Sequence, residues 1–142
     1  MNAPFVLDCS VTMAWFFADE ASARTDALLD ELSGGGRALV PRHWFLEVGN
    51  TLLMGERRKR CSEADTANFL GILRALAIDP DTEPAGNVAA AALAMARRHG
   101  LTLYDAAYLE LALRADRPIA TLDKQLRMAA KKAGVRCLPD DA

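Results

Sequence analysis

Four acidic residues lie in apolar sequence surroundings, where a carboxylate is costly unless something pairs with it. Burying an unpaired carboxylate costs several kcal/mol, so each side chain needs a hydrogen-bond donor, a basic partner or a cation. Carboxylates that face one another repel. A hard divalent cation that prefers oxygen ligands, Mg²⁺ or Mn²⁺, relieves this repulsion and retains waters for substrate phosphates. If the four acids meet, the pattern predicts metal-assisted phosphoryl chemistry. The residues are Asp8, Glu47, Asp105 and Asp123.

Two of the four acids directly follow predicted strands. Asp8 comes after the apolar run Phe5–Leu7, and Asp123 comes after residues 119–122. In an open parallel sheet the carboxyl ends of the strands lie at one edge, where ligands bind between diverging crossovers. We therefore expect Asp8 and Asp123 to meet, although they are far apart in the sequence.

The other two acids belong to predicted helices. Glu47 and Asn50 are three residues apart and share a helix face. Asp105 falls in the first turn of its helix. It lies at the level of the carboxyl ends of the strands if residues 101–103 lead from the edge of the sheet into this helix. These positions are compatible with a single acidic pocket.

Each acid also has a purely structural interpretation. Asp8 and Asp123 can each cap the helix that follows, because Asp is a favoured N-cap residue. Thr102 and Asp105 fit the Thr-x-x-Asp form of a capping box. Taken singly, the capping interpretation is the stronger one. Taken as four acids, two of them at strand ends, the functional interpretation is favoured.

Helices and strands alternate along the chain. The run 79–81, Asp-Pro-Asp, is predicted only to break a helix. Parallel strands need helical crossovers that cover both faces of the sheet, so the order favours an α/β layer fold with a central parallel sheet. The predicted strands are 5–7, 38–41, 119–122 and 135–138, and the predicted helices are 11–17, 21–32, 44–58, 62–76, 84–99, 104–115 and 124–133.

Composition limits the class of protein. A chain of 142 residues that is 51% apolar and 25% charged has the size and balance of one folded domain, here residues 1–142. A net charge of −2 gives no overall cationic field, so nucleic-acid binding must be local. The apolar stretch 88–96 is too short to span a membrane, and residues 1–7 lack the basic start of a signal peptide. Three scattered cysteines suggest no disulfide framework and a reducing cytoplasm.

Four short motifs in this order resemble those of PIN-domain ribonucleases of the VapC toxin type. The resemblance covers nearly all of the chain and implies a PIN-like three-layer fold with a central, mostly parallel sheet flanked by helices. The motifs are Val6-Leu-Asp8-Cys-Ser10, Glu47-Val-Gly-Asn50, Tyr104-Asp105-Ala-Ala-Tyr-Leu109 and Thr121-Leu-Asp123-Lys124.

The resemblance implies an endoribonuclease that depends on Mg²⁺ or Mn²⁺, with the four acids as its catalytic site. Asp8, Asp105 and Asp123 would hold the metal, and Glu47 would complete the site or orient the attacking water. Relatives often carry another acid two positions after the last motif Asp, where this chain has Gln125. The resemblance therefore leaves open whether the site holds one metal ion or two. The implied supporting polar residues are Ser10, Asn50 and Thr121.

Basic residues near these motifs suggest a rim that contacts RNA phosphates. A run of charges is more commonly a solvated face, and cations at a helix C-terminus also complement the helix dipole. The two interpretations are evenly balanced, and neither reveals the RNA sequence that is cut. The rim residues are Arg57, Arg58, Lys59, Arg60, Lys124 and Arg127.

Aromatic residues are concentrated in the first third of the chain. Most of them are expected in the core, but part of the set can form a groove for an amphipathic helix of a partner. The resemblance makes that partner a cognate antitoxin and makes a homodimer an expected assembly. The residues are Trp15, Phe16, Phe17, Trp44 and Phe45.

Four alternatives compete with the metal-dependent ribonuclease hypothesis. A haloacid-dehalogenase-like phosphatase would use Asp8 as nucleophile, but Ser10 stands where that family has its second Asp. A non-catalytic phosphoacceptor or interaction module would bind metal only for signalling. Nucleophilic chemistry at Cys9 lacks a nearby His or Arg, and metal-free acid–base cleavage would need His43 and His99 together.

Overall fold

The fold is built on a five-stranded parallel sheet. The computed structural model describes residues 3–140. The strand order is β3-β2-β1-β4-β5, and every neighbouring pair is parallel. The central strand β1 is fully buried, as expected for a purely apolar strand that is covered on both faces. The strands are β1 (Phe5–Leu7), β2 (Ala38–Val40), β3 (Ile78–Pro80), β4 (Ile119–Ala120) and β5 (Cys137–Leu138).

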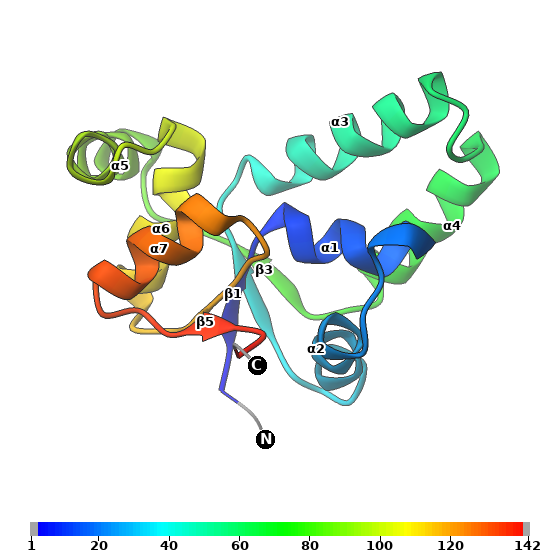
Figure 1. The fold of residues 1–142 in the computed structure, drawn as a ribbon, viewed down its shortest axis with the longest axis horizontal. Helices are drawn as coiled ribbons and strands as arrows, with labels where there is room; N and C mark the ends of the chain where they lie inside the picture. Colours follow the sequence, from blue (N-terminus) through cyan, green and yellow to red (C-terminus); the bar gives the residue numbers. More distant parts are fainter. Residues whose placement is uncertain (1–2, 141–142) are drawn as a thin grey trace.

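Helices flank the sheet on both sides, so the predicted three-layer α/β class is confirmed. Figure 1 shows α5, α6 and α7 on one side of the strands and α1 to α4 on the other, with α3 and α4 forming a hairpin that projects outward. Within the described residues, no helix is both long and apolar enough to cross a lipid bilayer. The helices are α1 (Cys9–Phe16), the short 3₁₀ helix η1 (Ala18–Glu20), α2 (Ala23–Ser33), α3 (Trp44–Arg57), α4 (Glu63–Arg74), α5 (Ala85–His99), α6 (Leu103–Ala115) and α7 (Lys124–Lys132).

The main differences between the predicted and the observed elements concern the strands. Strand β3 was not predicted, because Pro80 reads as a helix breaker; it lies on an edge strand, where a missing N–H is tolerated. Strands β2, β4 and β5 are shorter than the predicted strands 38–41, 119–122 and 135–138 that contain them. Residues 101–103 form no strand, since Thr102 caps α6 and Leu103 begins it.

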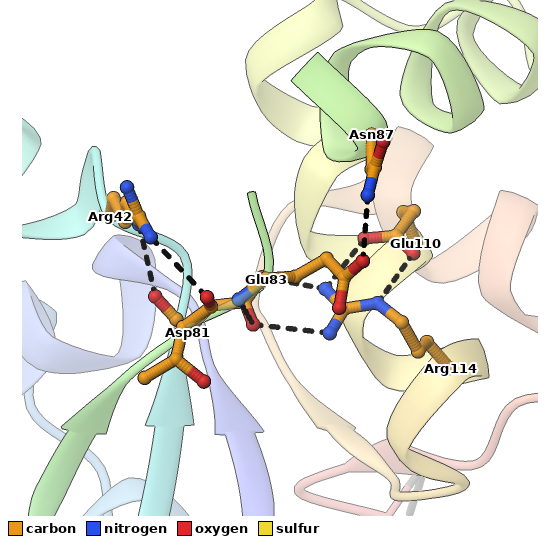
Figure 2. Close-up of polar contacts among 7 residues, drawn as sticks. Arg42, Asp81, Glu83, Asn87, Glu110 and Arg114 are labelled. Carbon is orange, nitrogen blue, oxygen red and sulfur yellow. Dashed lines mark hydrogen bonds and ion pairs between the residues drawn. The ribbon is translucent and has the colours of Figure 1, made fainter. Parts of the chain in front are cut away.

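A charged cluster, which we call the Arg114 clamp, fastens α6 to the segment after β3. It consists of Arg114, Glu110 and Asp81 (Figure 2). The guanidinium of Arg114 donates to both Glu110 carboxylate oxygens at 2.9 Å and to Asp81 Oδ1 at 3.1 Å. Glu110 is only 6% exposed. Burial alone would raise the pKa of Asp81, but hydrogen bonds from Arg114 hold it below its ordinary value. The clamp therefore keeps Asp81 ionised and paired with Arg114 at neutral pH.

Candidate active site

Asp8 is the central and most buried acid of the candidate site. It lies directly after β1 and is 6% exposed. Its Oδ2 accepts hydrogen bonds from the Ser10 hydroxyl at 2.6 Å and from the Thr121 hydroxyl at 2.7 Å. Asp8 occupies the N-cap position of α1, but its side chain makes no capping hydrogen bond. The carboxylate therefore lies between the Ser10 hydroxyl at the start of α1 and the Thr121 hydroxyl after β4.

The same two hydroxyls organise the loop that carries Asp123. The backbone N–H of Leu122 donates to Ser10 Oγ at 2.9 Å, and that of Asp123 donates to Thr121 Oγ1 at 3.1 Å. Asp123 Oδ1 in turn accepts from the N–H of Leu126 at 2.9 Å, so this acid does cap α7. Asp123 therefore caps α7 and also lies at the carboxyl edge of the sheet, so the capping interpretation is compatible with a place in the acidic site.

Glu47 is hydrogen-bonded by one residue, Tyr108, and approached by another, His43, and the sequence analysis assigned neither of them to this site. The buried Tyr108 hydroxyl donates to Glu47 Oε1, and His43 Nε2 lies 3.3 Å from the same oxygen. The His43 ring packs edge-on against Tyr108 with centroids 5.2 Å apart. Asn50, one turn further along α3, is exposed. Tyr108 is three residues after Asp105 on α6, and this spacing is the sequence signal that could have found it.

The four acids are close enough for their charges to act on one another. Burial raises the pKa of Asp8 above its ordinary value, and the charge of Asp123 adds to this. Burial also raises the pKa of Asp105, with contributions from Asp8 and Asp123. The pKa of Glu47 is raised by burial and by the charges of Asp8 and Asp105, against the lowering effect of the Tyr108 hydrogen bond. The repulsion predicted from the sequence is present at this edge of the sheet.

The donor set fits a hard divalent cation in its chemistry. Carboxylate and hydroxyl oxygens surround one edge of the sheet, and the raised pKa values mark a place where positive charge is favourable. Among residues 3–140, however, no three His, Cys, Asp or Glu side chains are arranged to hold a metal ion between them. Local donors hold Asp8, Glu47 and Asp123 individually. The acids are neighbours, but they are not closed around one point.

The basic residues of the expected rim are scattered. Arg57, Arg58 and Lys59 end α3 at the tip of the α3–α4 hairpin (Figure 1), and Arg57 lies roughly 15 Å further along the helix than Glu47. Arg60 donates to Asp19 at 2.9 Å and lies over the Phe17 ring at 3.9 Å.

Two further rim residues flank the last acid. Lys124 is exposed directly beside Asp123. Arg127 donates to the backbone carbonyls of Thr121, Leu138 and Pro139 at 2.8, 3.2 and 2.8 Å. Of this pair, Lys124 is therefore the exposed cation nearest in the chain to the acids, whereas Arg127 joins backbone segments.

The structure also bears on the competing chemistries. Burial raises the pKa of the Cys9 thiol to about 12, with Asp8 adding to the shift, so Cys9 is a protonated thiol rather than a nucleophile. His43 contacts Glu47, whereas His99 lines a separate surface hollow with Gln125 and Met128. The two histidines do not form a common acid–base pair.

Comparison with known proteins assigns this arrangement to a family. The model of the PIN domain matches residues 5–132, most of the chain. The chain belongs to the PIN domain family. The predicted resemblance is thereby confirmed. The match spans β1 to α7 and so contains all four acids of the candidate site.

Named relatives of this PIN domain agree in sequence and in fold. Ribonuclease VapC3 from Pyrobaculum aerophilum is 30% identical over 125 residues, which cover 85% of this chain and 90% of that protein. The crystal structure of PAE2754 from the same organism has a TM-score of 0.71 at 22% identity, over 97% of this chain and 92% of that one. A toxin–antitoxin complex from Klebsiella pneumoniae has a TM-score of 0.59 at 12% identity, over 89% and 90%. At these identities the two structures support the fold. PIN-domain ribonucleases generally depend on divalent metal ions.

Proposed function

We propose that this PIN domain is an endoribonuclease dependent on Mg²⁺ or Mn²⁺ and the toxin of a toxin–antitoxin pair. It is a hydrolase that acts on RNA phosphodiester bonds, and its proposed location is the cytoplasm. The observation that carries the proposal is the group of Asp8, Glu47, Asp105 and Asp123, whose negative charges act on one another at the carboxyl edge of the sheet. The family and the ribonuclease relative support the same chemistry.

Each acid has a distinct role in this proposal. Asp8, Asp105 and Asp123 would hold the cation, which when bound lowers the pKa of a water and neutralises the phosphate. Glu47 orients the attacking water, and the Tyr108 hydroxyl holds Glu47 in place by donating to Glu47 Oε1. Water attacks the phosphorus in line, the bond to the 3′ oxygen breaks, and the products carry a 5′-phosphate and a 3′-hydroxyl. No 2′-hydroxyl nucleophile is required.

Supporting residues hold the site and contact the substrate backbone. Ser10 and Thr121 fix Asp8 by two hydroxyl hydrogen bonds. Asn50 presents its amide on the exposed face of α3 near Glu47. Lys124 is placed to contact an RNA phosphate beside the acids, and the basic tip of the α3–α4 hairpin contacts RNA further away. Such contacts position a substrate without reading its sequence.

An aromatic groove between α1 and α4 is the proposed seat of an antitoxin helix. Phe16 packs on Phe17 and Phe69 with ring centroids 4.8 and 4.9 Å apart, and Ile72 beside them is 53% exposed. Apolar side chains at helical spacing on a partner fit such a groove. The toxin–antitoxin complex from Klebsiella pneumoniae, which shares the fold, supports a partner of this kind. The half-exposed Phe45 of α3 suits a homodimer contact.

Removal of the metal gives the direct test of the function. Purified protein incubated with RNA and Mn²⁺ is expected to produce fragments with 5′-phosphate ends, and excess EDTA is expected to stop the reaction. The same protein is offered a small phosphate monoester as a control. Release of phosphate from the monoester without cleavage of RNA would instead identify a phosphatase. If the protein binds Mn²⁺ but neither cuts RNA nor releases phosphate from the monoester, it is a non-catalytic module.

Metal binding should also appear as a pH-dependent gain in stability. The pKa values of Asp8, Glu47 and Asp105 are higher in the folded chain than their ordinary values, so their charged forms destabilise the fold above those pKa values. This cost disappears as the pH falls through the raised pKa values, because the folded state then binds more protons. A cation offsets the same cost at neutral pH. We therefore expect Mg²⁺ to raise the Tm more at about pH 7.5 than at about pH 5.

Thermal melts with Mg²⁺ and with EDTA at both pH values measure this difference. The variant Asp8→Asn is expected to lose most of the Mg²⁺ effect, while Asp30→Asn, at an exposed position of α2, keeps it. An equal Mg²⁺ shift in the Asp8→Asn variant and the wild type would place the ion away from these acids.

A further inference from the structure

A cavity of about 210 Å³ opens beside the candidate active site. Its walls come from the loop after β2, the segment after β3, α5 and the first turns of α6. Most of the lining is apolar. Val88, Ala89 and Ala92 contribute from α5, and Leu103 and Ala107 contribute from α6. The catalytic proposal above makes no use of this space.

The cavity shares its rim with the acids. His43 and Tyr104 both line it, and His43 also lies 3.3 Å from Glu47 Oε1. Tyr104 immediately precedes Asp105, is 64% exposed, and meets the His43 ring edge-on with centroids 5.5 Å apart. A phosphodiester placed at the acids therefore has its neighbouring nucleoside at this aromatic rim.

The polar wall of the cavity is already fixed by hydrogen bonds (Figure 2). Arg42 donates to the backbone carbonyls of Asp81 and Thr82 at 3.1 and 3.4 Å. Asn87 donates to the Glu83 carboxylate at 3.1 Å. The Arg114 clamp holds the same segment to α6. The cavity therefore keeps its shape without a ligand, as small-molecule sites generally do.

We infer that this cavity receives the nucleobase of a nucleotide next to the scissile phosphate, an inference that rests on the proposed ribonuclease function. A base has apolar faces and a polar edge, which match an apolar lining with one polar wall. Single-stranded RNA is recognised by stacking splayed bases on aromatic side chains such as Tyr and His. Tyr104 offers an exposed ring at the position that the flanking nucleoside must occupy.

Filling the cavity gives a sharp test with a matched control. Ala89 and Ala90 are neighbouring exposed residues of α5, and of the two only Ala89 lines the cavity. Each substitution, Ala89→Leu or Ala90→Leu, is combined with Asp8→Asn to prevent cleavage. Fluorescence anisotropy then measures how these double variants bind a short, fluorescein-labelled RNA pool of random sequence in the presence of Mg²⁺. We expect Ala89→Leu to weaken binding roughly tenfold, as for one lost base stack, relative to Ala90→Leu. Equal melting temperatures establish that both variants fold.

Cleavage products give a second readout that a merely structural effect does not alter. Without the Asp8 change, sequenced ends from the random pool should show a base preference at one position beside the cut. Ala89→Leu and Tyr104→Ala should lose that preference, whereas Tyr104→Phe and Ala90→Leu keep it. Unchanged RNA affinity and unchanged end nucleotides in Ala89→Leu would overturn the inference. A cavity that binds a protein partner instead of RNA would give this same result.

The two proposals fail in different ways. If Ala89→Leu weakens RNA binding but the wild type cuts no RNA with Mn²⁺, the proposed function is wrong, and the cavity is a nucleobase site in a protein that binds RNA without cutting it. If the wild type cuts RNA and Ala89→Leu behaves as Ala90→Leu does in both measurements, the cavity inference is wrong and the function stands.

Discussion

Replacing Asp8 by Asn is expected to abolish RNA cleavage while leaving the fold intact. Asp8 is the acid whose charge raises the pKa values of both Glu47 and Asp105, so it is the central charge of the site. Asn has the same shape, and its carbonyl oxygen still accepts the hydroxyls of Ser10 and Thr121. The lost charge should reduce kcat by at least about a hundredfold, the scale for removing one preorganised electrostatic contact.

The control for Asp8→Asn is Asp30→Asn, which makes the same chemical change at an exposed position of α2. Cleavage rates with Mn²⁺ and melting temperatures are compared for both variants. Because burial and neighbouring charge disfavour ionised Asp8, the Asp8→Asn variant should melt no lower than the wild type at neutral pH without metal. Cleavage by Asp8→Asn at the wild-type rate would contradict the assigned site.

Replacing Arg114 by Met should give the largest loss of stability. Glu110 is buried, and its carboxylate is bonded to Arg114 through both oxygens. Without the guanidinium, a buried charge is left unpaired. We expect the free energy of unfolding to fall by about 3 kcal/mol, the scale for breaking a buried ion pair. Urea denaturation at neutral pH measures the change.

Two comparisons make the Arg114 prediction specific. Adding Glu110→Gln to Arg114→Met removes the unpaired charge and should restore much of the stability. Arg37→Met, which breaks an exposed pair with Asp79, should cost only about 0–1 kcal/mol. Because the pKa of Asp81 is lowered, the clamp stabilises the fold at neutral pH, and this contribution is lost as the pH falls below about 4. Equal losses for Arg114→Met and Arg37→Met would show that the clamp behaves as a surface pair.

The strands that are short apolar runs could be predicted from the sequence. The edge strand could not, because a strand at the edge of a sheet does not need to be apolar. Phe5–Leu7 and Ala38–Val40 are apolar, largely buried and bounded by polar residues or Pro, so pattern alone predicted them. Strand Ile78–Pro80 is half-exposed and contains Asp and Pro, which suit an edge that pairs on one side only. Its pairing with β2 is a tertiary fact that no local pattern contains.

The sequence singled out the acids of the candidate site because a carboxylate among apolar residues is unusual in itself, and the fold brings these acids near one another. The positions of His43 and Tyr108 beside Glu47 were not predicted, since these contacts are made by the fold, and only the spacing of Tyr108 from Asp105 hinted at a shared helix face. The Tyr108 contact joins positions 61 residues apart. The opposite happened with Arg127, which the charge pattern placed on a rim for RNA and the structure directs to three backbone carbonyls. Charge identifies a cation but not its partner.

The position of Arg127 links two distant parts of the polypeptide mechanically. The Arg127 guanidinium joins the carbonyls of Leu138, at the end of β5, and Pro139, just after it, to that of Thr121, whose hydroxyl supports Asp8. Tension applied to the segment beyond β5, whether by a fused domain or by a docked protein, therefore reaches the loop that carries the acids. The end of the sheet is in this way connected to the candidate site without being part of it.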